Sequence, residues 1–237
     1  MGADAAGEKE ASQAFNVALA ASKTPTLEHY LFSTLPEASA LSGGKKPVPH
    51  MDHKARVDDR IRKELPELGR KMTCIWLGWY SANMAGMGLI RPFEVPLSGG
   101  KYIWAQPSRP DALLPISGDV GVNLGVFAAA ALAHPDKARG KYINVRSDVL
   151  TFTEILKVWS EVTGHEAEYL PMSFDSFARL WGPAGVEMAQ QYAFGEAVDD
   201  WEAQKKQDIC QPEEIGIKKE QLVDLRGHLM ELKAKLL

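Results

Sequence analysis

Residues 48 to 59, VPHMDHKARVDD, bring histidines, acidic side chains and a lysine close together. Histidines spaced three apart could bind a metal ion, but a zinc site needs three or four ligands, and the other histidines are scattered singly along the chain. We therefore expect no metal here. The remaining chemistry is proton transfer by histidine near neutral pH and the binding of a hydroxyl or a phosphate by lysine.

Helical spacing groups some of these residues on one face. His50, Lys54, Val57 and Ile61 recur at i, i+4, i+7 and i+11 of a helix predicted from about 50 to 65. We expect this face to turn toward a sheet. Lys54 would then either extend its ammonium to the rim or reach into a cleft and hold a ligand group. His50, one turn earlier, would donate or accept a proton.

The elements around this helix predict an α/β fold. A helix is expected over 8–22, buried strands over 27–34 and 72–77, and a loop with several glycines and prolines over 36–49. The order strand, loop, helix, strand is typical of the crossover unit of a parallel sheet.

The chain beyond residue 100 mixes short strands with helices. KYIWAQ, ALLPIS and KYINV indicate strands, and 119–135 indicates a helix. Thr151 and Glu154 form a capping box for a helix that Gly164 ends. Beyond residue 170 the pattern is helical, and 218–237 is expected to be an amphipathic helix docked on the surface.

Composition excludes several classes of protein. Of 237 residues, 45% are hydrophobic and 24% charged, which is typical of globular domains, and a net charge of −4 gives no reason to expect direct nucleic-acid binding. The N-terminus lacks a secretory pattern, and no run approaches the roughly 20 apolar residues that span a bilayer. With only Cys74 and Cys210, a reducing compartment fits best, so we expect a protein of the cytoplasm or nucleus without a membrane partner.

Several motifs together resemble the NmrA-like branch of the atypical short-chain dehydrogenases. They are HYLFSTLP, VPHMDHKARVDDRIR and WLGWYSANM, with LPISGDVGVNLGVFAAAALAHP and DVLTFTEILKVWSEVTGH downstream. The resemblance covers most of residues 10 to 170 and is strongest over 27–85. In that family the lysine of a Tyr-x-x-x-Lys pair usually stays while the tyrosine is replaced, and His50 with Lys54 matches the replaced form.

The resemblance implies an NADP(H)-dependent oxidoreductase acting on a small organic carbonyl, in fungi often within secondary metabolism. Lys54 would lie beside the nicotinamide ribose, with His50 as first and Tyr80 as second candidate acid. The residues that would contact the cofactor or line the substrate pocket are Ser33, Thr34, Lys54, Gly78, Trp79, Tyr80 and Asn83. The alternatives are a non-catalytic regulator that binds a dinucleotide or a transcription factor, and a remnant that binds no cofactor.

One family feature is missing from the sequence. A dinucleotide fold opens with a strand, a glycine-rich turn and a helix that holds the pyrophosphate, and no such motif is found here. We therefore expect an incomplete Rossmann-like parallel sheet over 1–90 and a small mixed substrate-binding subdomain with C-terminal helices over 91–237. The chain would be a fragment, or pair with a protein partner or second copy that completes the sheet, or have repacked into a smaller fold.

Overall fold

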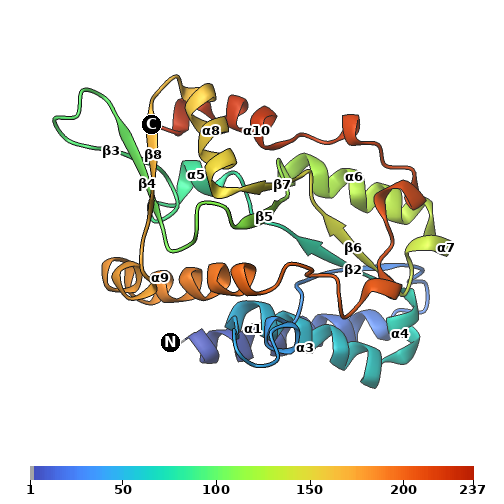
Figure 1. Cartoon of the computed structure of the whole chain (residues 1–237). Coiled ribbons are helices and arrows are strands. Elements are labelled where there is room, and N and C mark those ends of the chain that lie inside the picture. The colour runs from blue at the N-terminus through green and yellow to red at the C-terminus, as the bar shows by residue number, and fades with distance from the viewer. Residues whose placement is uncertain (1–2) are drawn as a thin grey trace. The chain divides into compact units, whose positions relative to one another are not determined.

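The computed structural model describes residues 3–237 and divides them into two compact units (Figure 1). The first comprises the chain up to Leu77 together with Leu124–Val145 and Asp200–Lys218, and the second comprises Gly78–Asn123, Arg146–Asp199 and Lys219–Leu237. The two units therefore interleave along the chain, whereas the sequence suggested two successive parts divided near residue 90. Assignment of a cofactor role and a substrate role to separate parts stays a prediction.

The first unit is built on a parallel sheet. Strands β1 (Tyr30–Thr34), β2 (Met72–Leu77) and β6 (Tyr142–Val145) lie in the order β1-β2-β6. Tyr30 pairs with Met72 and Cys74 with Tyr142, both in parallel registers. The predicted crossover from β1 through a helix to β2 is confirmed.

Helices cover both faces of this sheet (Figure 1). On one face lie α1 (Ala3–Ser22), α3 (Pro49–Glu64) and α4 (Pro66–Lys71), and on the other lies the part of α6 (Val120–Ala133) that belongs to this unit. The first face packs side chains of the strands against the helices; its buried core includes Phe15, Ala18, Phe32, Val57, Ile61, Cys74 and Trp76. Shorter helical pieces complete the unit: α2 (Ala38–Leu41), α7 (Pro135–Ala138), η1 (Lys206–Asp208) and η2 (Pro212–Ile215).

Local chemistry sets the ends of α3. Pro49 stands at its first position, where a missing N–H costs nothing. The carboxylate of Asp52 accepts a hydrogen bond from the backbone N–H of Val48 at 3.1 Å, which satisfies a donor at the helix entry. Leu65 has left the helical region and is followed by Pro66, so α3 ends and α4 begins in a new direction.

The second unit contains two small sheets. Strands β3 (Phe93–Glu94), β4 (Tyr102–Gln106) and β8 (Ala167–Pro171) lie in the order β3-β4-β8, with β4 and β8 parallel, and β5 (Leu113–Ile116) pairs antiparallel with β7 (Asp148–Thr151). Its core is aromatic, with Trp104, Phe152 and Trp159 fully buried. The helical pieces are α5 (Asn83–Gly86), α8 (Phe152–Thr163), α9 (Phe174–Ala197), η3 (Lys219–Gln221), α10 (Leu225–Glu231) and η4 (Lys233–Lys235).

Two local predictions for this unit have opposite outcomes. The capping box of Thr151 and Glu154 is confirmed at the start of α8, and Gly164 ends that helix in the left-handed conformation. The single helix predicted over 218–237 is wrong, because α10 alone is α-helical there. Asp224 explains where α10 begins, since its side chain accepts a hydrogen bond from Gly227 N at 2.8 Å and so caps the helix.

The α/β class with a parallel sheet is confirmed. Among the residues that the structure describes, no helix combines the length and the apolar character needed to cross a bilayer.

Gly78, directly after β2, lies too close to a neighbouring backbone for any side chain. A Cβ there would stand 2.6 Å from the Pro115 carbonyl oxygen, which also accepts a hydrogen bond from Trp79 N at 2.7 Å. We expect Gly78→Ala to lower the free energy of unfolding by about 1–3 kcal/mol, measured by urea denaturation. Gly86→Ala in α5 is the matched control, because its Cβ would meet nothing within 4 Å. Equal effects of the two substitutions would contradict this explanation.

Candidate functional site

The buried surface of α3 is wider than the single stripe that was expected. Met51, Ala55 and Asp58 are buried, and Asp58 bonds to side chains of the sheet strands β1 and β6. From the expected stripe, Val57 and Ile61 are buried in one core with strand residues, whereas Lys54 ends beside α1. The prediction that Lys54 turns toward the sheet is therefore wrong, because α3 also packs against α1.

Lys54 ends in an ion pair with Glu10 of α1. The two side chains are 33% and 51% exposed, so the pair lies at the rim of the contact between α1 and α3. The rim was one of the two positions that the sequence suggested for the Lys54 ammonium. A role for Lys54 at a cofactor stays a prediction, and it requires this ion pair to open.

The other polar residues at the start of α3 shape the local structure. Asp52 is buried and accepts hydrogen bonds from Ser39 N at 2.8 Å and Ser39 Oγ at 2.7 Å, in addition to the one from Val48. His53 is also buried, with Nδ1 at 2.9 Å from an Arg56 nitrogen and 3.5 Å from Glu8. His50 is half-buried in the first turn, where a catalytic role stays a prediction.

Ser33 and Thr34 end β1, as expected. Ser33 is exposed, so its hydroxyl is available to a ligand. Thr34 is buried, and its hydroxyl donates a hydrogen bond to Asp58 Oδ2 at 3.4 Å. The carboxyl ends of parallel strands are where open α/β sheets bind ligands, so Ser33 is the better-placed of the two hydroxyls.

The remaining predicted residues belong to the second unit. Trp79 is only 4% exposed and lies in the aromatic core, so its indole has little surface left for a ligand. Tyr80 is 39% exposed, and partial burial raises the pKa of its phenol above the usual value. Asn83 is half-buried at the start of α5, and Gly78 makes the close backbone approach described above.

A buried carboxyl on α3 was not anticipated from the sequence. Asp58 Oδ1 accepts a hydrogen bond from the Tyr142 hydroxyl at 2.9 Å, and the Arg62 Nε lies 3.8 Å away. Burial raises the pKa of Asp58 to about 6, an effect that the hydrogen bond from Tyr142 partly offsets. The adjoining cavity of about 10 Å³ holds one water molecule at most, so the carboxyl has no room for a substrate. Asp58 therefore anchors the helix.

The signal for Asp58 was present in the helical spacing. Met51, Ala55, Asp58 and Arg62 follow one another at i, i+4, i+7 and i+11, so a carboxylate and a guanidinium continue a stripe that begins with two apolar residues. Such a residue is buried only when hydrogen-bonded or paired. Its partner Tyr142 lies far along the chain, and no local pattern indicates that contact.

These features define an α/β protein with a parallel, helix-covered sheet whose strand ends carry the candidate ligand groups. The NmrA-like family model matches residues 3–216, so the chain belongs to the NmrA-like family. An NmrA-like family domain-containing protein of Dictyostelium discoideum is 29% identical over 68% of this chain and 52% of its own length. The nitrogen metabolite repression protein nmr of Neurospora crassa is 25% identical over 63% of this chain and 30% of its own. The chain thus spans about half or less of these relatives.

Solved structures show the same fold. The negative transcriptional regulator NmrA superposes with a TM-score of 0.72 at 21% identity, covering 97% of this chain and 73% of that one. Its complex with NADP gives a TM-score of 0.67 at 20% identity over 95% and 66% of the two chains. The triphenylmethane reductase of Citrobacter sp. with NADP(H) gives 0.60 at 17% identity over 98% and 72%.

The raised pKa of Asp58 makes stability depend on pH in a defined direction. Because the folded pKa of about 6 lies above the unfolded value, the folded state binds the proton more tightly, and this stabilisation is lost as pH rises from about 4 to 6. We expect the difference in unfolding free energy between wild type and Asp58→Asn to fall by up to about 3 kcal/mol between pH 4 and 7, measured by urea denaturation.

The control for this experiment is Asp136→Asn, which removes an exposed carboxylate of the same unit. Its difference from wild type is expected to stay nearly constant over that pH range. A wild type that gains stability relative to Asp58→Asn as pH rises would show that Asp58 is an ordinary ionised partner of Arg62, contrary to this account.

Proposed function

We propose that the chain is an NAD(P)H-binding, oxidoreductase-type member of its family, acting on a small organic carbonyl. Support comes from the exposed Ser33 hydroxyl at the carboxyl end of β1 and from Lys54 on the crossover helix that follows it. Solved structures with the same fold include the regulator NmrA in complex with NAD and in complex with NADP. A relative named as an oxidoreductase of Aspergillus hancockii supports the oxidoreductase class. The proposal also includes a role in fungal secondary metabolism, which the family resemblance of the sequence implies.

Two residues of the first unit would hold the sugar end of such a cofactor. Ser33 offers a free hydroxyl, while Lys54 is held by Glu10. An ion pair this exposed contributes only about 0–1 kcal/mol, so a ribose hydroxyl could displace the carboxylate at small cost. Lys54 would then donate hydrogen bonds to the ribose.

When bound, the cofactor supplies a hydride to the carbonyl carbon, and the protein must supply a proton to the oxygen. His50 is the first candidate donor, since an imidazole exchanges protons near neutral pH. Tyr80 is the second, but the raised pKa of its phenol makes it the weaker acid. The Tyr80 hydroxyl therefore suits hydrogen bonding to the carbonyl better than full proton transfer.

Partner and location belong to the same proposal. β1 is the end strand of its sheet, so a protein partner or a second copy of the chain could pair with its outer edge. We place the protein in the cytoplasm or nucleus.

Calorimetric titration with NADPH tests the role of Lys54. Lys54→Ala should weaken binding about tenfold or more, because it removes the donor to the ribose. Glu10→Gln should leave binding equal or tighter, because it frees the lysine. Lys63→Ala, an exposed lysine of the same helix, is the matched control and should bind as wild type does. If Lys54→Ala binds like the control, the cofactor role of Lys54 is wrong.

The second candidate is a regulator that binds the dinucleotide without turnover. Relatives named as nitrogen metabolite repression proteins favour it. NADPH oxidation over a panel of quinones and small ketones separates the two: an oxidoreductase consumes NADPH, and His50→Ala slows it more than Tyr80→Phe. Binding without consumption across the panel would favour the regulator, and no binding would leave a chain without cofactor function.

A further inference from the structure

The strand β8 lies at the end of its sheet and leaves one edge unpaired. Among residues 3–237, its only strand neighbour is β4, in the parallel register Tyr102 with Ala167 and Trp104 with Tyr169. Tyr102 N donates to Glu166 O at 2.9 Å, and Met172 N donates to Gln106 O at 2.9 Å. In a parallel ladder these two bonds direct the backbone groups of Glu168 toward β4. The N–H and C=O groups of Ala167 and Tyr169 therefore point to the open edge.

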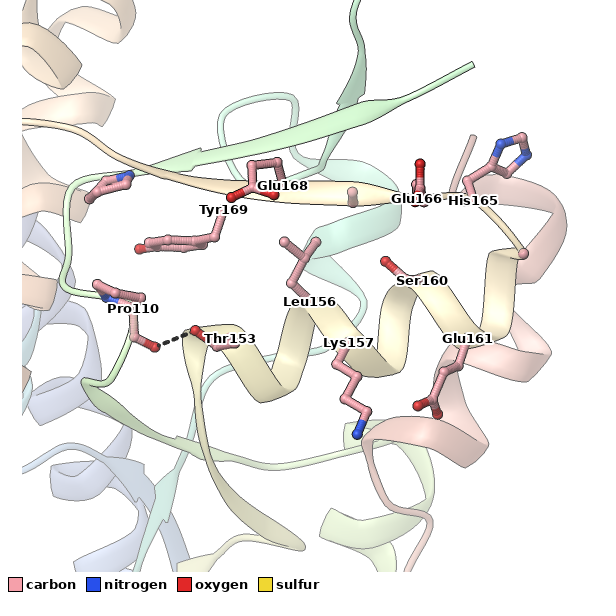
Figure 2. Close-up of a pocket in the computed structure, with 13 residues that line it drawn as sticks. Pro110, Thr153, Leu156, Lys157, Ser160, Glu161, His165, Glu166, Glu168 and Tyr169 are labelled. Carbon is pink, nitrogen blue, oxygen red and sulfur yellow. Dashed lines mark hydrogen bonds between the residues drawn. The ribbon is translucent and has the colours of Figure 1, made fainter. Parts of the chain in front are cut away.

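A groove runs along this open edge (Figure 2). It has a volume of about 740 Å³ and lies between β8 and the helix α8, both within the second unit. Side chains from both faces of β8 line it, which places it beside the strand and not on one face. The lining that matters for recognition is Leu156, Lys157 and Ser160 from α8 and Ala167, Glu168 and Tyr169 from β8.

The two sides of the groove differ in chemistry. Leu156 points from α8 toward β8 and is buried in the aromatic core of the unit, against which the partly buried Ala167 and Tyr169 also pack. On the other face of the strand, Glu168 is exposed and has no ion partner among residues 3–237. Tyr169 also anchors the strand, because its hydroxyl donates to Ser108 O at 2.8 Å.

Two further glutamates of the groove are already paired. Glu166 lies 3.1 Å from Lys101 Nζ, and Glu161 forms an ion pair with Arg226. Lys157 is the cation of the lining, and Figure 2 shows it on the side of α8 turned away from β8. The uncompensated charge beside the strand edge is therefore the carboxylate of Glu168.

We propose that this groove binds an extended peptide segment of a partner protein, which adds to β8 as a further strand. An edge strand flanked by a helix offers main-chain hydrogen bonds for affinity and alternating side-chain positions for specificity. Residues of the added strand that face α8 meet the partly exposed side chains of Ala167 and Tyr169 and are apolar. On the opposite face, the residue beside the Glu168 carboxylate is basic. The segment recognised thus alternates apolar and basic side chains.

Pro171 limits the length of this pairing. It occupies the next outward-facing position after Tyr169 but has no N–H to donate. An added strand therefore pairs mainly with Ala167 and Tyr169. Such a short ladder gives weak, reversible binding and prevents the unlimited edge-to-edge association that long open strands invite.

Fluorescence anisotropy of a labelled, capped heptapeptide of alternating lysine and valine tests the proposal on the full chain. We expect saturable binding that weakens about tenfold or more when the peptide amides are N-methylated, since methylation removes the ladder donors. An alternating glutamate and valine peptide should bind at least several-fold more weakly. In hydrogen exchange, the bound lysine peptide should slow the amides of Ala167 and Tyr169.

Variants of the protein locate the binding. Ala167→Pro removes an outward N–H that β4 does not use, and should weaken binding about tenfold, whereas Ala167→Val keeps the N–H and should bind as wild type does. Glu168→Lys should weaken binding most at low salt, with Glu231→Lys on α10 as the control. If Ala167→Pro fails to fold, the N-methylated peptide and Glu168→Lys carry the test alone. Unchanged binding of the methylated or acidic peptide, or to Glu168→Lys, would overturn the proposal.

Discussion

The buried carboxyl of Asp58 joins the crossover helix α3 to both outer strands of the parallel sheet. Through Thr34 it contacts the end of β1, and through Tyr142 it contacts β6. A helix that packs on a sheet through apolar side chains alone can rotate at modest cost, because dispersion and burial are not directional. The hydrogen bonds of Asp58 to the two strands oppose such a rotation. Asp58 therefore sets the rotation of α3 about its own axis, and with it the direction in which every other residue of the helix points.

That rotation decides where the candidate catalytic residues lie. With Asp58 against the sheet, His53 and Lys54 lie against α1, where they contact Glu8 and Glu10 respectively. The carboxyl does not need to add stability to do this. Replacing a buried polar network by apolar residues is often neutral or favourable, so we read Asp58 as a determinant of geometry. Ligand access to Lys54 then depends on an exposed ion pair, which is a contact that opens easily.

Much of the fold followed from the sequence because its signals are local. The strand expected over 27–34, which the structure begins at Tyr30, the strand 72–77, the helix after the proline-rich loop, and the capping box of Thr151 with Glu154 are set by residues close in the chain. The face of α3 that meets the sheet, the pairing of β4 with β8 and the interleaving of the two units depend on contacts between distant segments. Helical periodicity cannot choose between two buried stripes when a helix has two neighbours. The spacing of apolar and charged residues over 218–237 is that of one amphipathic helix. This spacing does not indicate that Asp224 caps a helix that begins inside the segment.

The most direct test of this account is a crystal structure of the chain with NADPH. We expect the nicotinamide ribose near Ser33 at the end of β1, the Lys54 ammonium released from Glu10 and bonded to the ribose, and α3 unrotated with Asp58 still bonded to Tyr142. A structure in which NADPH binds while Lys54 remains paired with Glu10, or in which the nucleotide lies away from the end of β1, would contradict the account.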